Sequence, residues 1–474
     1  MSELMELKKV IKFALGPIAG ALLGLVSLPI ITWFFNQEDV GRISMLQITV
    51  SLTTLVFCLG LDQSYVREYH DENNKARLFK IVWLPTSLFL LVAATLTIIF
   101  TDTKLSILLF ELDSISLTLL TILLIVTSLS ARFFSLILRM EERGLAYSLS
   151  QVLPKIMVLV VLGLYIILDI RKSFDHLLYA YVIAGVGGGV VLAWTVRNTI
   201  KKAIDEVFDS TKFKEMLSFG LPLVLGAFAY WGLTAADKLM LRALSTYKEL
   251  GLYSVAISFA SAATILQSVF STVWAPTVYK WASNNENIDK VHEVTSYITL
   301  AVGVLFSLAG ACSWLVTFLL PEEYISVQWV LIVCMGAPLL YTLSETTAVG
   351  IGITRRSSFS MLASIIAFLT NIIGNYLLVP QLGAKGAGIS TCIAFFVLFV
   401  LRTEFSSRLW IPIKRLKLYT VTFLLVVGAI SSALYGENFP LYIPTLWLTF
   451  LVFLLITYKV NFRKLLLFVK NRKI

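Results

Sequence analysis

Apolar stretches of about 20 residues, separated by short polar segments, recur along the whole chain. A helix needs about that length to cross roughly 30 Å of hydrocarbon, so each stretch predicts one membrane span. The pattern is that of an all-α polytopic membrane protein with about 14 transmembrane helices. Their expected ranges are 13–35, 43–65, 79–101, 115–138, 148–169, 176–197, 217–241, 252–279, 293–319, 327–351, 358–380, 384–402, 416–435 and 440–459.

Parts of this pattern occur twice, about 210 positions apart. Val40-Gly41-Arg42-Ile43-Ser44 stands before an apolar run, and so does Leu250-Gly251-Leu252-Tyr253-Ser254. Tyr147-Ser148 and Phe359-Ser360, 212 positions apart, each open a later span. Agreeing offsets at two places predict a tandem duplication of a six-helix half, an arrangement typical of transporters.

Glycine and proline are frequent in the first span of each predicted half. Such helices can bend, as a transporter that opens alternately to two sides requires, although close helix packing would explain the glycines equally well. The residues are Gly16, Pro17, Gly20, Gly24 and Pro29, then Gly220, Pro222 and Gly226.

Basic residues are unevenly distributed among the loops. With a cytoplasmic N-terminus, 29 of the 39 Lys and Arg fall in inside segments and 7 in outside loops. The remaining three, Arg132, Lys155 and Lys238, lie within spans. Because cytoplasmic loops are enriched in basic residues, both termini are expected in the cytoplasm. Spans 1 and 7 then start on the same side, which makes the repeat parallel.

The duplication and the loop pattern together predict four segments. Residues 1–200 form an N-terminal six-helix lobe, and 201–214 a charged cytoplasmic linker. Residues 215–404 form the C-terminal six-helix lobe, and 405–474 contain helices 13 and 14 and a basic cytoplasmic tail.

Composition excludes several classes of function. Only 14% of residues are charged, against about a quarter in soluble proteins. The net charge of +10 comes from basic residues dispersed in loops, so no nucleic-acid partner is expected. The four cysteines lie far apart in predicted spans, which indicates neither a disulfide framework nor a metal site. The chain has no phosphate-binding loop, nucleophile elbow or zinc spacing, so we expect neither an enzyme nor a cofactor.

Positive charges within the first half are candidates for substrate binding. Arg132, Arg139 and Arg143 follow at helical spacing and share a face. Lys155 lies in the next span, directly after Pro154. Together they could line a cationic cavity, where forked guanidinium groups suit phosphate. Alternatively, Arg139 and Arg143 only anchor the inner loop, and Arg132 extends to the interface.

Polar amides in the second half form another candidate set. Asn371 and Asn375 share one helix face, and Gln267 lies in the middle of span 8. They are assigned to substrate binding, although such amides often only hydrogen-bond between helices.

Five charged residues near or inside spans are candidates for gating or coupling. A buried charge is costly in a membrane and therefore marks a functional site or an ion pair. Asp237 and Lys238 end span 7, and could also neutralise each other. Asp62 and Arg67 lie at the inner end of span 2, and Glu345 lies in span 10 without an evident counter-ion.

Two local motifs resemble a known family. They are Gly60-Leu61-Asp62-Gln63-Ser64-Tyr65-Val66-Arg67-Glu68-Tyr69, and Ala236-Asp237-Lys238 leading to Glu249-Leu250-Gly251-Leu252-Tyr253-Ser254-Val255-Ala256. The chain resembles the polysaccharide-unit (Wzx-type) flippases of the MATE-like, or multidrug/oligosaccharidyl-lipid/polysaccharide, exporter superfamily. That family often has arginine where this chain has Lys238, which keeps the charge but not the forked donor.

The resemblance implies a role in surface polysaccharide synthesis. Such proteins move a polyprenyl-diphosphate-linked oligosaccharide across the bacterial cytoplasmic (inner) membrane for O-antigen (lipopolysaccharide), capsule or exopolysaccharide. The expected partners are this lipid-linked oligosaccharide, the lipid bilayer, and a polysaccharide polymerase with its chain-length machinery.

Three other functions compete with this interpretation. A drug/cation antiporter on the same fold would need acidic residues in the first-lobe cavity, where the charges here are positive. A lipid II flippase shares the fourteen spans and the cationic cavity, so only the local motifs argue against it. A membrane glycosyltransferase or polymerase usually needs a large external loop or catalytic acids, and the outside loops here are short.

Overall fold

A computed structural model describes Gly16 and residues 19–20, 22–101, 103–170, 172–284 and 290–459. All regular elements in these ranges are helices, and each predicted span overlaps one. The all-α fold is therefore confirmed. The tail predicted beyond Lys459 and the first 15 residues lie outside the described ranges.

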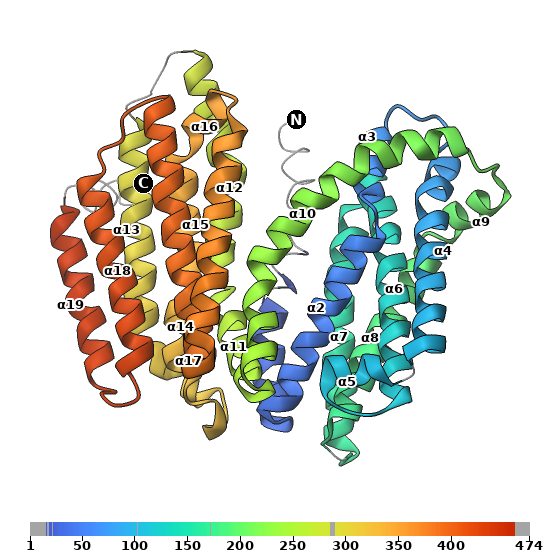
Figure 1. Ribbon diagram of the computed structural model, residues 1–474, viewed down its shortest axis with the longest axis horizontal. Coiled ribbons are helices and arrows are strands. Elements are labelled where there is room, and N and C mark those ends of the chain that lie inside the picture. Colours follow the sequence, from blue (N-terminus) through green and yellow to red (C-terminus); the bar gives the residue numbers. More distant parts are fainter. Residues whose placement is uncertain are drawn as a thin grey trace, which may run out of the picture. The chain divides into compact units, whose positions relative to one another are not determined.

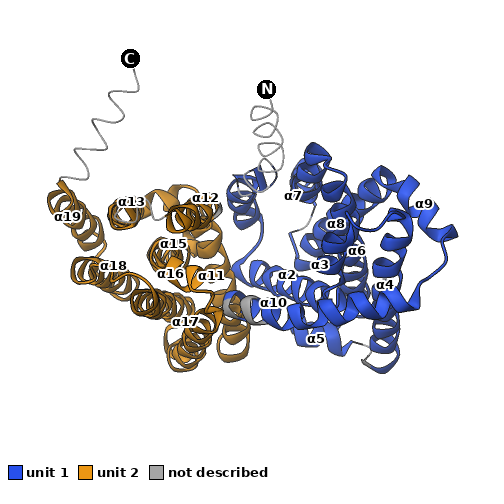
Figure 2. Cartoon of the chain, turned by 90° about the horizontal axis from the view of Figure 1, so that it is seen from above, with its two compact units in different colours: residues 1–235 blue, residues 236–474 orange. Residues whose placement is uncertain are grey.

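The chain forms two compact units, residues 1–235 and 236–474 (Figures 1 and 2). The division falls inside the long helix α10, whereas the sequence places the linker at 201–214. That linker contains the end of one helix and the start of another. The domain boundaries derived from the sequence stay a prediction.

Unit 1 begins with the apolar helix Leu22–Phe34. Its further helices are α2 (Gln37–Phe57), α3 (Leu61–Glu68), α4 (Lys75–Thr101), α5 (Lys104–Phe110), α6 (Ile115–Met140), α7 (Gly144–Ile167), α8 (Phe174–Thr195), α9 (Arg197–Asp205) and most of α10 (Ser210–Leu244). The central helix is α6, which packs against α2, α4, α7 and α8.

Unit 2 continues with α11 (Tyr247–Ala260), α12 (Ala263–Ser283), α13 (Lys290–Ala311), η1 (Ser313–Phe318), η2 (Glu322–Tyr324), α14 (Val327–Cys334), α15 (Gly336–Thr347), α16 (Val349–Ile353), α17 (Ser357–Leu409), α18 (Leu416–Tyr435) and α19 (Tyr442–Thr457). Helices α14 and α15 form its centre and pack on α17. The last two helices, α18 and α19, pack against α13, and α18 also contacts α14.

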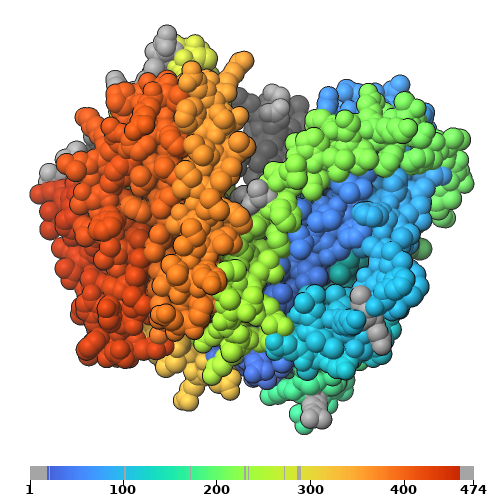
Figure 3. Space-filling model, in the orientation of Figure 1, coloured from blue at the N-terminus to red at the C-terminus, as the bar shows by residue number. Residues whose placement is uncertain are grey.

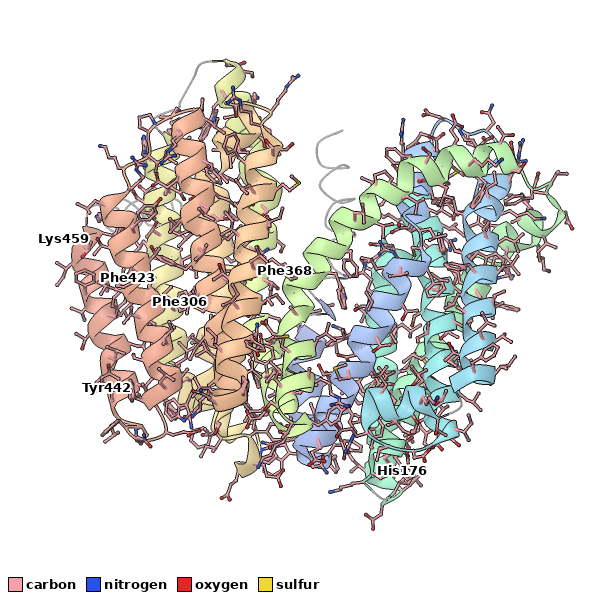
Figure 4. The ribbon with its side chains drawn as sticks, in the orientation of Figure 1. His176, Phe306, Phe368, Phe423, Tyr442 and Lys459 are labelled. Atoms are coloured by element: carbon pink, nitrogen blue, oxygen red, sulfur yellow. The ribbon has the colours of Figure 1, made fainter. Side chains whose placement is uncertain are left out.

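Many of these helices are suited to a membrane. Nine of the helices in the described ranges are long and apolar enough to cross a bilayer, or ten if the bent pair α11 and α12 forms one span. Helices α4 and α17 lie at the surface in Figure 3 and carry exposed apolar side chains such as Phe89, Val92, Ile365 and Ile373. An apolar outer face is stable in lipid, so these helices identify a multi-pass membrane protein.

The backbone repeats at two turns, which supports the duplication. Glu142 and Arg355, 213 positions apart, have φ values of 56° and 57°, unusual for residues other than glycine. The residue after each donates its backbone N–H to a carbonyl five positions earlier, Arg143 to Leu138 and Arg356 to Ile351.

Two predicted spans differ from the structure in continuity. The span expected at 43–65 is broken at Leu59 and Gly60, both with positive φ, so that α3 starts in a new direction. The reason is a close backbone contact within unit 1. A Cβ atom on Gly60 would stand 2.1 Å from the carbonyl oxygen of Gly220 in α10.

The spans expected at 358–380 and 384–402 form one helical run, α17, with a kink at Gly383. Its second part has a new N-terminus, where the Glu249 carboxylate accepts the backbone N–H of Ala384 at 2.8 Å. This carboxylate caps the helix and matches its dipole.

The glycines of the first helix mediate close packing. A Cβ atom on Gly16 would stand 2.8 Å from the Cα of Ser148 in α7. Gly20 and Gly24 lie on the same face and leave room for the Lys155 side chain. Close packing therefore accounts for Gly16, whereas a Cβ atom on Gly20 or Gly24 would only be in ordinary contact with Lys155, at 3.6 and 3.8 Å from Nζ.

Candidate substrate-binding and coupling sites

Unit 1 contains a cavity of about 460 Å³ between α2, α6, α7 and α8. Its wall is mainly apolar, with hydroxyl and amide groups from Ser51, Ser128, Ser150 and Gln151. Two of the predicted substrate-binding residues, Arg132 and Lys155, both line it. The structure thus brings together the two cations that the sequence placed inside the first half.

Arg132 forms an ion pair on the wall of this cavity. Its Nη2 atom lies 2.9 Å from Oδ2 of Asp62 on α3, which also accepts Gln63 Nε2 at 3.1 Å. The Arg132 side chain is 45% exposed and Asp62 only 12%. Because one hydrogen bond uses only part of a guanidinium fork, Arg132 keeps donors for a ligand.

Arg132 and Asp62 also line an adjacent pocket of about 420 Å³ in unit 1. This pocket shares Ser51, Thr54 and Arg132 with the larger cavity, and continues to Leu223 and Trp231 of α10. The Trp231 indole donates to Ser51 Oγ at 3.0 Å. Arg132 therefore lies where the two hollows join.

Lys155 reaches across the larger cavity to the first helix. Its Nζ atom donates to the backbone carbonyl of Gly20 at 2.6 Å. Gly20 and Gly24 present no side chain there, and a Cβ atom on either would lie within 4 Å of Nζ. An ammonium group held by a neutral carbonyl keeps its positive charge available to an anion.

The other basic candidates of unit 1 lie elsewhere. Arg139 and Arg143 are exposed, and Arg143 lies 3.3 Å from Glu141. Arg67 and Asp62, both gating candidates at the inner end of the second span, have separate partners. The Arg67 guanidinium lies over the ring of Phe219 at 4.2 Å and contacts Glu68 at 3.8 Å.

Unit 2 buries a carboxylate inside a polar cluster. Asp237 is 2% exposed and accepts four hydrogen bonds. Asn371 and Asn375 donate to Oδ1 at 2.9 and 2.8 Å. The hydroxyls of Tyr253 and Thr391 donate to Oδ2 at 2.6 and 2.5 Å.

This cluster also contains unused acceptors. The side-chain oxygens of Asn371 and Asn375 are buried and have no hydrogen-bond partner among the residues that the structure describes. Unpaired buried carbonyl oxygens are costly, so such a pair next to a carboxylate suits a small cation. The sequence indicated the two asparagines and Asp237 separately. Tyr253 belongs to the motif that follows Asp237, but nothing in the sequence indicated that its hydroxyl would hold the carboxylate, and Thr391 gave no signal at all.

Lys238 and Gln267 do not join this cluster. Lys238 follows Asp237 on α10 but is half-buried, and the carboxylate is held by the four neutral donors instead. Gln267 is half-buried on α12, whereas the cluster is built from α10, α11 and α17.

Glu345 has a counter-ion that the sequence analysis missed. Arg402 of α17 places Nη1 2.9 Å from Glu345 Oε1 and 2.9 Å from Ser344 Oγ. Arg402 stands at the end of the span expected at 384–402, where a basic residue attracts no attention. Glu345 lies 213 positions after Arg132, another paired charge.

A search of the described ranges finds no group of three or more His, Cys, Asp or Glu side chains that could hold a metal ion. The four cysteines are free, three of them buried and Cys312 exposed.

Comparison with known proteins agrees with this architecture. Residues 7–282 match the family described as "Polysaccharide biosynthesis protein". The chain is 24% identical over 258 residues to a probable low-salt glycan biosynthesis flippase, Agl15, of Haloferax volcanii. That match covers 52% of each protein, so the chain spans about half the length of this relative.

Solved structures share the fold at low sequence identity. The lipid II flippase MurJ, in an inward closed conformation, superposes with a TM-score of 0.67 at 16% identity, covering 95% of this chain and 99% of the other. An inward-facing MATE-family multidrug resistance transporter gives 0.55 at 16% identity, covering 82% and 95%. A Vibrio cholerae MATE transporter mutant gives 0.53 at 13% identity, covering 85% and 96%.

These proteins are named as flippases and transporters, which agrees with the expectation that the chain is not an enzyme. The match over residues 7–282 covers more than half of the sequence. It confirms, at the level of the family, the resemblance that the motifs indicated. The chain belongs to the polysaccharide biosynthesis protein family and has the fold of the MurJ and MATE transporters.

Proposed function

We propose that this protein moves a polyprenyl-diphosphate-linked oligosaccharide across the bacterial cytoplasmic membrane for surface polysaccharide synthesis. The observation that carries the proposal is the cavity of unit 1, where Arg132 and Lys155 face one hollow among apolar helices. Family membership and the flippase relative support the same class of substrate. O-antigen, capsule and exopolysaccharide units all share this diphosphate chemistry.

The charges of the cavity favour an anion. Arg132 and Lys155 contribute two positive charges and Asp62 one negative, which leaves a net charge of +1. A diphosphate can bind the free donors of Arg132 and replace the Gly20 carbonyl at Lys155. In a poorly solvated cavity such charge-assisted hydrogen bonds are roughly twice as strong as neutral ones.

The same charges argue against a drug/cation antiporter in unit 1. A cationic substrate would need an unpaired carboxylate, and Asp62 is already held by Arg132. A lipid II flippase remains compatible, because lipid II also carries a diphosphate. The accumulated intermediate in a deletion strain separates these two functions.

We further propose that Asp237 couples transport to a monovalent cation or a proton. A single buried carboxylate balances one positive charge, and the free oxygens of Asn371 and Asn375 could turn toward it. Binding there would exchange hydrogen bonds within one cluster built from α10, α11 and α17. Such an exchange gives the two states of a transporter different affinities for the ion.

The test is transport by the purified protein in liposomes with a fluorescent polyprenyl-diphosphate glycan. Lys155→Gln and Arg132→Gln should each lower the initial flipping rate by about tenfold or more, since each removes a charged hydrogen bond. Lys201→Gln on α9, an exposed lysine outside the cavity, is the matched control and should flip at the normal rate. Normal rates in both cavity variants would refute the proposal.

In cells, gene deletion should remove the surface glycan and accumulate its lipid-linked precursor. Accumulation of lipid II instead would favour the peptidoglycan function. A polysaccharide polymerase and its chain-length proteins would act on the product after flipping.

A further inference from the structure

Unit 2 contains a pocket of about 430 Å³ that the proposed transport cavity does not include. It is formed by α12, α15, α16 and both parts of α17. Two arginines and one glutamate line it, together with three hydroxyl groups. These residues are Arg355, Arg402, Glu345, Tyr279, Ser357 and Ser360.

Arg402 is the main donor of the pocket and is incompletely used. It donates to Ser344 and Glu345 through Nη1, and to Ser360 at 3.4 Å through Nη2. Its Nε atom is buried and has no hydrogen-bond partner within the described part of the chain. A buried guanidinium N–H without an acceptor is costly, so the site has unmet capacity for a negatively charged oxygen.

The backbone around the pocket adds further attraction for an anion. Ser357 and Ser360 belong to the first turns of α17, where free N–H groups and the helix dipole carry a partial positive charge. Arg355 precedes this helix in a left-handed conformation, φ 57°. Gly352 makes room for the hydroxyl of Tyr279, since a Cβ atom there would lie 2.1 Å from it.

The duplication gives the pocket a counterpart in unit 1. Glu345 and Arg132 lie 213 positions apart, the same offset as the matching turn residues Arg355 and Glu142. Each is half of an ion pair, but the signs are reversed. In unit 1 the arginine is on the central helix, whereas in unit 2 the central helix supplies the carboxylate and α17 the arginine.

The pocket therefore contains its own anion. Glu345 is 18% exposed and Arg402 15%, so both reach the pocket surface and neither is sealed in the core. The Glu345 carboxylate accepts a hydrogen bond from Nη1 of Arg402. It leaves other guanidinium N–H groups for a second acceptor. A phosphate has three oxygens and can satisfy the fork more completely.

We propose that this pocket of unit 2 is an anion-binding site for a phosphate or diphosphate group, held by Arg355 and Arg402, and that Glu345 occupies Arg402 until the anion binds. The proposal goes beyond the function assigned to the unit 1 cavity and does not depend on it. The phosphate can belong to a lipid headgroup, to a lipid-linked diphosphate or to a free ion.

The test is isothermal titration of the full-length protein in zwitterionic nanodiscs with inorganic pyrophosphate. Glu345→Gln removes the competing charge and should strengthen binding by about tenfold. Arg355 is exposed, so the Arg355→Gln variant should fold normally. It should weaken pyrophosphate binding by a similar factor. Arg408→Gln, an exposed arginine later on α17 and outside the pocket, is the matched control and should change nothing.

A purely structural ion pair gives a different result. In that case Glu345→Gln lowers the melting temperature without strengthening binding, and Arg355→Gln binds like the wild type, which overturns the proposal. If Glu345→Gln does not fold, unchanged binding in Arg355→Gln overturns it alone.

Two further titrations identify the source of the phosphate. If geranylgeranyl diphosphate binds more tightly than pyrophosphate, and Arg355→Gln abolishes this gain in affinity, the result supports the site with a lipid-linked diphosphate as its ligand. Competition by phosphatidylglycerol in the nanodisc supports it with a lipid headgroup as ligand. Slow flipping in Lys155→Gln would support the role of the unit 1 cavity. Weaker pyrophosphate binding in Arg355→Gln and stronger binding in Glu345→Gln would confirm the unit 2 site independently of that result.

Discussion

Individual charges within the helices of this protein are held by neutral dipoles or by a single counter-ion. Asp237 is surrounded by four neutral donors, so its charge is stabilised without being cancelled. Arg132 and Glu345 each have one oppositely charged partner, at 2.9 Å in both cases. A charge held by dipoles can still attract an ion, which distinguishes Asp237 from the two ion pairs.

Replacing Asp237 by asparagine tests the coupling role at this scale. The variant keeps an oxygen for the amides of Asn371 and Asn375, so the protein should remain folded. Transport should lose its dependence on a sodium or proton gradient, because the charge that attracts the ion is gone. The measurement is flipping in liposomes with and without each gradient.

The matched control is Asp209→Asn, a loop aspartate hydrogen-bonded to Arg77 and to backbone N–H groups. It should keep the full gradient response. An unchanged response in Asp237→Asn would exclude the residue from coupling.

Among the elements, close approach of helices depends on a few glycines. The start of α3 and the middle of α10 touch backbone to backbone at Gly60 and Gly220. Backbones can approach this closely only without side chains, which is how small residues stabilise helix contacts in membranes. Gly60 also needs its left-handed conformation, φ 71°, to begin α3.

Alanine at either contact glycine should destabilise unit 1. In Gly220→Ala the new Cβ would stand 2.8 Å from Gly60, and overpacking of this kind costs roughly 1–3 kcal/mol. Gly226→Ala, on the same helix, meets nothing within 4 Å and serves as the control. Thermal unfolding in detergent should show a lower midpoint for Gly220→Ala only, and equal midpoints would contradict the contact.

At the scale of the molecule, polar contacts in each unit join segments that the sequence predicts on the same side of the membrane. In unit 2, Glu437 of the α18–α19 turn binds Lys385 at 2.8 Å and Ser326 at 2.6 Å. Glu437 and Ser326 belong to loops that the sequence predicts on the outer side, and Lys385 stands at the outer end of the span predicted at 384–402. In unit 1, Lys212 binds Glu68 at 2.7 Å, and both belong to segments predicted inside. The loop contacts agree with alternating spans, while the cytoplasmic location of the termini stays a prediction.

Cysteine labelling tests which side is which. Lys172→Cys and Lys201→Cys, each in a variant lacking the four native cysteines, should react from opposite sides of intact cells. A membrane-impermeant maleimide should label position 172 directly, and position 201 only after permeabilisation, because basic segments stay inside. Labelling of both positions from the same side would overturn the predicted topology.

The contact at Glu437 should make stability depend on pH. Burial would raise the pKa of Glu437, but its hydrogen bonds with Lys385 and Ser326 outweigh this and hold the pKa below its ordinary value. A lowered pKa stabilises the fold above the unfolded value, about 4.3, and this stabilisation is lost as pH falls through the folded value. Glu437→Gln should therefore melt earlier at pH 7, by an effect of about 1 kcal/mol or less.

At a pH well below the folded-state pKa of Glu437, which itself lies below the ordinary value, the difference from wild type should disappear, since both side chains are then neutral. The measurement is the melting midpoint at both pH values. Glu322→Gln, an exposed glutamate of η2, is the control and should show no such pH-dependent difference. A constant difference at all pH values would show that the carboxylate charge is not involved.

Many residues of the candidate binding and coupling sites could be predicted from the sequence, because a charge inside a membrane is costly. Arg132, Lys155, Asp237 and Glu345 stand out because a charged residue in an apolar stretch requires a partner or a function. Tyr253, Thr391 and Arg402 could not be identified in the same way. Hydroxyls are common in membrane helices, and an arginine near a span end resembles an ordinary loop residue.

The sequence by itself determined the helical class and the approximate position of the apolar spans, because hydrophobic length is a local property. Its repeated motifs also predict the duplication. Only the tertiary structure decided which charges meet. Arg132 joins Asp62 across 70 positions, and Asp237 joins Asn371 across 134. Such pairs depend on which helix faces pack together, and on a break such as that at Gly60, which no spacing along the chain reveals.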